Sequence, residues 1–528
     1  MVLCQTTPPP CVLVGREPCS VCQEEIELEL KIQELQDKRR IIRARINAEH
    51  DPFNFRLPPE LASLIFSLSM GKEDYEPGHS TLRKLPTQFL LGSVSRWWRQ
   101  LACSTPQLWS TISFTLVKKN TNVLPPLQFI NNWLQLSGSL PLTLWITENS
   151  AFDFPRETCR PVIDSLTRHL GRWYDVTLDL DQHYFNHFRA ASPPSNLYNL
   201  EISSCEVSDI DDPPTPHFSI PRPSPTRLTL RSFPLSAIDI EWVNITCLTL
   251  AFISLDECIE AIKSAPLLES CKLLSLDPLT DEDSPAFHSK HLFRHTGLRK
   301  LTLEGIEVDL LIVFLELMDF PSIEELSYEL ENETEVECLI SFLNRSRICL
   351  KRLALLINED IRGALKKLLD AVPDLSNLEC EFSSHMPFVV VPINDFLQRL
   401  SSSPPILPGG SPGFLPNLQS LVLRIHVAGT PLWQNVPPIF SLSHRKPLNF
   451  KIETKDWRLK LDDGLLSILE LIDQGFKICI LGFKKPWVPV RLEFDGNLHG
   501  AGYLLQANAV TWKRAKSEHC EGGIMVPG

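Results

Sequence analysis

A short apolar pattern recurs from residue 197 onward and restricts the possible folds of this chain more than any other feature. In each copy, apolar residues occupy the first, fourth and sixth positions, as Leu298, Leu301 and Leu303 do. Successive copies start 20 to 30 residues apart, except for a gap of 43 residues before the last. Strong copies start at Leu197, Ile245, Leu298, Ile323, Leu350 and Leu418, and weaker ones at Pro225, Leu268 and Leu375.

Segments with helical spacing lie between several copies, so each unit is expected to be a strand followed by a helix. These segments are 255–264, 308–318, 336–344 and 361–371. One unit cannot bury its own apolar face, whereas a stack of units can, with the other strand residues facing outward from a parallel sheet. The period resembles that of leucine-rich repeats. The alternative is an irregular α/β domain in a chain rich in leucine.

A small helical module is expected upstream, over residues 53–114. Pro58 and Pro59 open its first helix, because proline suits the first turn. An apolar stripe follows at helical spacing, formed by Leu61, Leu64, Ile65 and Leu68. After a polar insertion over 71–88, one further helix carries Leu90, Leu91, Val94, Trp97, Trp98 and Leu101. So few short helices cannot bury all these side chains, and part of this surface is expected to meet a partner.

The order of these residues resembles the F-box, specifically the F-box-like variety common in fungal proteins. The matching residues are Leu57-Pro58, Glu60, Ile65-Phe66, Val94, Arg96-Trp97-Trp98-Arg99 and Leu108-Trp109. The resemblance implies a substrate-recognition subunit of an SCF-type ubiquitin ligase. Its F-box would bind the adaptor subunit and, through it, a cullin scaffold, while the repeat region would bind a protein target. Such a receptor is not an enzyme and needs no cofactor.

Two sets of residues are the candidates for these contacts. The adaptor-binding candidates are Leu57, Pro58, Leu61, Ile65, Val94, Trp97, Leu101 and Trp109, for each of which burial inside the module is the alternative. The target-binding candidates lie between the apolar strand positions and are Arg227, Thr229, Lys300, Thr302, Glu325, Ser327, Arg352 and Glu379. Their charges are mixed, so no single charge class of target is indicated. A repeat scaffold without ligase coupling is the competing function.

The remaining segments complete an expected α+β chain, with an N-terminal helix, a small all-α module and an irregular α/β repeat solenoid. Residues 1–23 read as a disordered tail, and 24–50 as a helix with a heptad seam formed by Leu28, Ile32, Leu35, Ile42 and Ile46. That helix either self-associates weakly through residues 24–48 as a coiled coil or folds onto the next domain. Residues 120–194 are expected to hold degenerate repeats, 195–430 the main array, and 431–528 a cap or irregular region.

Charge and cysteine usage narrow the partners and the compartment. A net charge of −13 provides no basic field for nucleic acid or an anionic membrane, and no apolar run approaches the roughly 20 residues of a bilayer span. The N-terminus does not resemble a secretory signal. Fifteen scattered cysteines fit reduced thiols in the cytoplasm or the nucleus.

The sequence contains two weak matches to known metal-binding or catalytic motifs. Cys19 and Cys22 have metal-ligand spacing, but no second close pair follows at zinc-site distance. The segment 409–413 fits the formula of a serine nucleophile elbow by coincidence, because it lies among prolines without a strand before it. No metal and no catalytic residue are therefore expected. A hydrolase hidden in the C-terminal half is the least favoured function.

Overall fold

The structure is a computed structural model in which the chain divides into two compact units, Met1–Leu178 and Asp179–Gly528. It describes residues 19–49, 53, 56–70, 86–116, 127–148, 160–205, 217–277, 292–358, 362–383, 390–402, 413–426, 433–454, 458–460, 463–484, 488–490, 493–495, 502–505 and 512–515. Mixed helix and sheet is confirmed as the fold class, and the main sheet is parallel.

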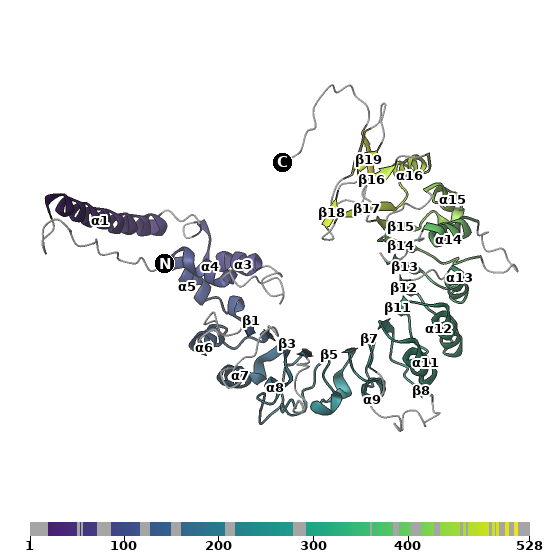
Figure 1. The fold of residues 1–528 in the computed structure, drawn as a ribbon, viewed down its shortest axis with the longest axis horizontal. Coiled ribbons are helices and arrows are strands. Elements are labelled where there is room, and N and C mark those ends of the chain that lie inside the picture. The colour runs from purple at the N-terminus through teal and green to yellow at the C-terminus, as the bar shows by residue number, and fades with distance from the viewer. Residues whose placement is uncertain are drawn as a thin grey trace. The chain divides into compact units, whose positions relative to one another are not determined.

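The described part of the first unit contains a long N-terminal helix, a group of short helices and strands, of which β3 continues into the second unit (Figure 1). Its helical elements are α1 (Ser20–Glu49), α3 (Pro59–Ser69), α4 (Thr87–Val94), α5 (Arg96–Cys103), η2 (Pro106–Trp109), α6 (Leu127–Leu136), α7 (Arg160–Thr167) and η4 (Leu170–Arg172). Its strands are β1 (Thr111–Leu116), β2 (Leu142–Glu148) and β3 (Trp173–Asp181), in that order in the sheet. Strand β1 lies partly inside the range expected for the helical module.

Two expectations about this unit are corrected. Helix α1 begins at Ser20, so residues 20–23 belong to the helix and not to the N-terminal tail, whose residues 1–18 lie outside the described part. The single helix expected from Leu90 to Leu101 is two helices, α4 and α5. Ser95 separates them in an extended conformation, and its side chain accepts a hydrogen bond of 3.1 Å from the backbone N–H of Trp98. Serine favours this capping position over the helix interior.

The second unit is built on parallel strands that follow the order of the chain within the sheet, with β8 (Phe293–Arg294), β10 (Met318–Asp319) and β16 (Arg458–Lys460) outside it. They are β4 (Asn199–Cys205), β5 (Arg227–Arg231), β6 (Cys247–Ala251), β7 (Ser270–Leu274), β9 (Lys300–Glu304), β11 (Glu325–Leu330), β12 (Arg352–Ile357), β13 (Asn377–Phe382), β14 (Ser420–Ile425), β15 (Asn449–Thr454) and β17 (Ile478–Lys484). Strand β18 (Val488–Val490) then pairs antiparallel to β17.

Helices connect many of these strands and lie together on one side of them (Figure 1). They are α8 (Gln182–Phe185), α9 (Leu255–Ser264), α11 (Val308–Leu317), α12 (Glu333–Arg345), α13 (Arg362–Asp370), α14 (Val390–Ser402), α15 (Pro437–Ser441) and α16 (Asp463–Asp473). The described part also contains three pairs of short strands outside the main sheet. They are β8 (Phe293–Arg294) with β10 (Met318–Asp319), β16 (Arg458–Lys460) with β19 (Glu493–Asp495), and β20 (Gly502–Leu505) with β21 (Trp512–Ala515).

All nine copies of the apolar pattern contain a strand, and their fourth and sixth residues are buried. These residues stack in register from strand to strand, as Leu228 on Leu248 and Leu230 on Leu250 show. The series does not end at residue 430 as expected. Strands β15 and β17 continue it, with Phe450 in register with Leu421 at the fourth position.

Polar side chains link successive segments on the helix side through hydrogen bonds to backbone oxygens. Arg172 donates a hydrogen bond of 2.8 Å to the carbonyl of Leu140, and Arg345 donates one of 3.0 Å to that of Met318. His295 lies 3.1 Å from the carbonyl of Ala265, just after α9.

Candidate functional site

Helix α3 presents its apolar stripe to solvent instead of to the interior. Ala62 and Phe66 point inward, where the Phe66 ring packs 4.9 Å from the ring of Trp98. The opposite residues range from 40% exposed at Ile65 to 75% exposed at Leu68. The outward apolar face comprises Leu61, Leu64, Ile65 and Leu68. Such a contiguous set of exposed apolar side chains is typical of an interaction surface.

Helix α4 adds further exposed apolar residues to this module. Leu90 and Val94 are exposed over about half of their surface. Trp97 on α5 is less exposed than either of them. We define the α3–α4 apolar surface as Leu61, Leu64, Ile65, Leu68, Leu90 and Val94.

The eight adaptor-binding candidates divide between surface and interior. Pro58, Leu61, Ile65 and Val94 are exposed, and Leu57 and Trp97 are half-buried. For the other two the alternative of burial inside the module holds: Leu101 and Trp109 are buried, and the indole Nε1 of Trp109 donates a hydrogen bond of 2.7 Å to the carbonyl of Ala102. The spacing of the sequence alone could not show which of the two tryptophans, Trp97 or Trp109, is buried in the interior of the module. The candidates did not include Leu64, Leu68 and Leu90, which are also exposed, although the stripe pattern contained the first two.

The target-binding candidates fall into two adjacent rows on the outward face of the sheet. One row aligns Arg227, Lys300, Glu325 and Arg352 through successive strands, and the other aligns Thr229, Thr302, Ser327 and Glu379. Glu325 lies 3.7 Å from the Nζ of Lys300 and 3.9 Å from the Nε of Arg352. Thr302 was expected to contact a target, but this expectation is wrong, because Thr302 is only 6% exposed and is not available to a partner.

The same outward face carries a charge network across β13, β14 and β15. Arg424 pairs with Glu379, lies 3.4 Å from Glu381, and its Nε is 2.7 Å from a carboxylate oxygen of Glu453. Burial by itself lowers the pKa of Arg424, but the hydrogen bond to Glu453 and the nearby carboxylates outweigh it and raise that pKa. Burial would raise the pKa of Glu453, but its hydrogen bonds from Lys451 and Arg424 hold it below its ordinary value.

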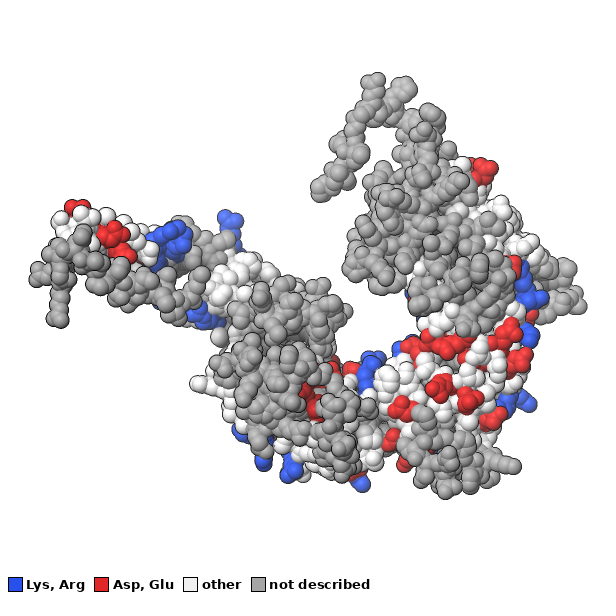
Figure 2. Space-filling model, viewed as in Figure 1, with Lys and Arg blue, Asp and Glu red and all other residues white. Residues whose placement is uncertain are grey.

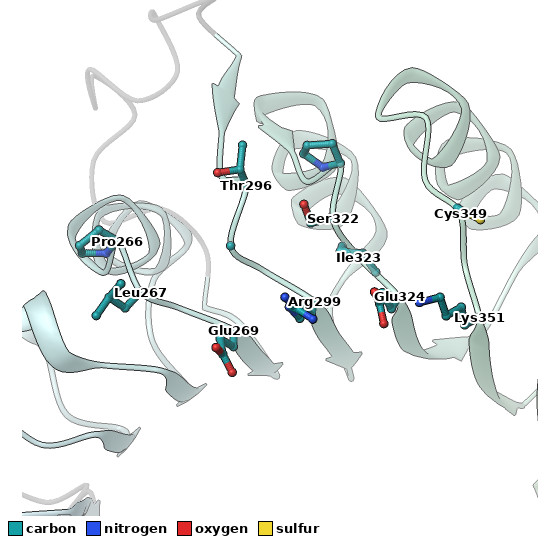
Figure 3. Close-up of a pocket in the computed structure, with 12 residues that line it drawn as sticks. Pro266, Leu267, Glu269, Thr296, Arg299, Ser322, Ile323, Glu324, Cys349 and Lys351 are labelled. Atoms are coloured by element: carbon teal, nitrogen blue, oxygen red, sulfur yellow. Dashed lines mark ion pairs between the residues drawn. The ribbon is translucent and has the colours of Figure 1, made fainter.

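Where the chain enters four successive strands, side chains surround a pocket of about 460 Å³ (Figure 3). Glu269, Arg299, Glu324 and Lys351 follow one another along it with alternating charge, and Lys351 lies 3.0 Å from Glu324. The exposed Leu267 adds an apolar contact. A pocket with both charges and an apolar wall suits a peptide segment rather than a purely anionic ligand.

No reactive nucleophile is evident in this pocket. Burial, followed by the charge and hydrogen bond of Asp374, raises the pKa of Cys349, which keeps its thiol protonated near neutral pH. Among the described residues, no group of three or more histidine, cysteine or acidic side chains could hold a metal. Cys19 lies just before α1 and Cys22 lies in its first turn, and most of 409–413 lies outside the described part.

A strained aromatic residue marks the opposite end of the strands. The residue just after each of β5, β6, β7 and β9 has positive φ: Ser232, Phe252, Ser275 and Gly305. Phe252 has a φ of 53° and remains 52% exposed. A bulky side chain in this conformation is unusual, and strain of this kind gathers at functional positions. No local signal in the sequence identifies it.

Neither a scan against protein-family models nor a search of the curated proteins finds a match to this chain. None of the helices in the described part combines the length and the apolar character that crossing a bilayer takes.

Proposed function

We propose that the chain is the substrate-recognition subunit of an SCF-type ubiquitin ligase. The carrying observation is the outward stripe of α3, because it lies within the residues that resemble an F-box and has no covering partner among the described residues. The α3–α4 apolar surface binds the adaptor subunit, which links the chain to a cullin scaffold. Burial of several leucine-sized side chains there supplies about 1.5–3 kcal/mol each.

The second unit supplies the target-binding surface as an irregular leucine-rich-repeat solenoid. This part of the proposal is supported by the parallel pairing of successive strands in the sheet. It is also supported by the burial of the fourth and sixth residues in each copy of the apolar pattern. The outward rows and the pocket around Arg299 offer mixed charges, and Phe252 supplies an exposed aromatic anchor of the kind that dominates protein interfaces. The receptor acts by proximity, since it raises the effective concentration of a target lysine near the ubiquitin-conjugating enzyme. We place it in the cytoplasm or the nucleus, where that enzyme works.

Calorimetry with the full chain and the purified SCF adaptor subunit tests the proposal. Wild type is expected to bind, and Leu61→Asp with Ile65→Asp to weaken binding by at least about 100-fold, because two charges would be desolvated in an apolar interface. Tyr174→Asp is the matched control, since Tyr174 is exposed in the same unit but outside the α3–α4 apolar surface. No binding by the wild-type chain would favour a repeat scaffold without ligase coupling.

A further inference from the structure

Helix α1 displays a complete heptad seam to solvent. Its apolar members are 48% to 71% exposed: Val21, Leu28, Ile32, Leu35, Ile42 and Ile46. Glu25 and Arg39 occupy the two remaining positions of the same 3-4 spacing. Folding of α1 onto the next domain, the alternative that the sequence left open, would cover this seam, and no described residue does so. A second helix along the seam would bury it.

The charges of α1 indicate which helix covers it. Acidic residues gather in the first half, namely Glu24, Glu25, Glu27, Glu29 and Glu34. Basic residues gather in the second half, namely Lys38, Arg39, Arg40, Arg43 and Arg45. Figure 2 shows red atoms toward one end of α1 and blue atoms toward the other. Each half is therefore complementary to the other half of an identical helix that runs in the opposite direction.

The two polar positions of the seam give the same orientation independently. In a parallel pair, equivalent positions meet, so Glu25 would face Glu25 and Arg39 would face Arg39 inside an apolar interface. In an antiparallel pair with the fullest overlap, Leu28 meets Arg39 of the second copy and Ile32 meets Leu35. Glu25 then lies one layer from Arg39 of the second copy, within reach of its guanidinium.

We propose that two copies of the chain associate through α1 as an antiparallel coiled coil. The occupant of the seam is thus a second copy of this chain. If the proposed ligase function holds, the dimer presents two target-binding surfaces, which increases avidity without any new target contact. The association itself does not depend on that function.

Sedimentation velocity of the full chain over a range of concentrations tests the association. The wild type is expected to shift from monomer to dimer as concentration rises, and Leu28→Glu is expected to remain monomeric. Leu30→Glu is the matched control, because Leu30 is 66% exposed on the side of α1 away from the seam. A wild-type chain that stays monomeric throughout, or an equal loss with Leu30→Glu, would overturn the proposal. Adaptor binding by Leu28→Glu should be unchanged, which separates this test from that of the proposed function.

A charge-exchange cycle on the same chain tests the orientation. Arg39→Glu and Glu25→Arg are each expected to weaken dimerisation by about ten-fold, because each replaces two attractive contacts with two repulsive ones. The combined variant is expected to recover wild-type dimerisation. In a parallel dimer every variant would still pair like charges, so unchanged dimerisation in both single variants would refute the antiparallel arrangement.

Discussion

The guanidinium of Arg445 donates a hydrogen bond of 2.6 Å from Nη1 to the carbonyl oxygen of Leu415, which lies 30 residues earlier in the chain. Its Nη2 donates a second bond, of 2.5 Å, to the carbonyl of Phe414. The Arg445 side chain is fully buried, and that burial lowers its pKa to about 10. A buried cation is tolerated here because two backbone carbonyls face it.

Arg445→Met should therefore destabilise the second unit. Methionine fills most of the same volume but donates to neither carbonyl oxygen, and the free energy of unfolding should fall by about 2–4 kcal/mol because two buried hydrogen bonds are lost. Urea denaturation followed by fluorescence measures the difference. Lys446→Met, at the neighbouring exposed position, should change stability by less than about 0.5 kcal/mol. Equal stability of the two variants would show that the buried bonds contribute nothing.

Glu335 makes the stability of the second unit dependent on pH. Its carboxylate accepts hydrogen bonds from the Tyr328 hydroxyl at 3.1 Å and from the Glu331 backbone N–H at 2.9 Å. Burial nevertheless raises its pKa above the ordinary value of 4.5, despite the opposing effect of these bonds. The folded state thus binds the proton more tightly than the unfolded state, so this group lowers stability as pH rises from 4.5 through the folded pKa.

Glu335→Gln removes this titration. Relative to wild type, the variant should gain stability as pH is raised from about 4 to 7, as measured by urea midpoints along the pH series. Glu333→Gln, on the exposed side of the same helix, should show no comparable trend. A difference between wild type and Glu335→Gln that stays constant with pH would contradict the assignment.

Apolar periodicity predicted the strands well because it records burial on one face of a sheet. It missed the two copies that contain β15 and β17, which start at Pro447 and Gly475, although it recognised the weaker copy that starts at Pro225. The same periodicity identified the stripe of α3 but not its direction. The buried side of that helix needs only Ala62 and Phe66, because Trp98 of another helix completes the packing.

Features that depend on distant segments could not be predicted. The role of Arg445 depends on a carbonyl 30 residues away, and the strain at Phe252 depends on hydrogen bonds to the backbone of the next strand. The break at Ser95 was predictable in principle, because serine is a preferred helix cap. It was missed because the apolar spacing of α4 and α5 continues almost in phase across it.

Phe252 should tolerate glycine better than alanine. Its positive φ is costly for any residue with a Cβ, and the equivalent residue after β9 is already Gly305. Phe252→Gly should therefore be more stable than Phe252→Ala by about 1 kcal/mol in thermal or urea denaturation. The order would be reversed if the backbone at this position relaxed to negative φ. Both variants should lose target binding if the exposed ring is the anchor.

Arg424 should stabilise the sheet in a manner that depends on pH. Glu453 has a folded pKa below its ordinary value of 4.5, so its contribution is present above pH 4.5 and is lost as pH falls through the folded pKa. Arg424→Met removes a partner of Glu379, Glu381 and Glu453 together, and should cost about 1–2 kcal/mol at pH 7.

That cost should shrink as pH falls through the folded pKa of Glu453, because a protonated Glu453 no longer forms an ion pair with the guanidinium, and it should also fall partly in high salt. Urea midpoints at pH 7 and pH 3.5, with and without 1 M salt, measure both trends. Arg352→Met is the matched control, because the Arg352 side chain is more exposed than that of Arg424 and its Nε lies 3.9 Å from the carboxylate of Glu325. If Arg424→Met costs the same at both pH values, packing of the arginine stem and not its charge holds the three strands together.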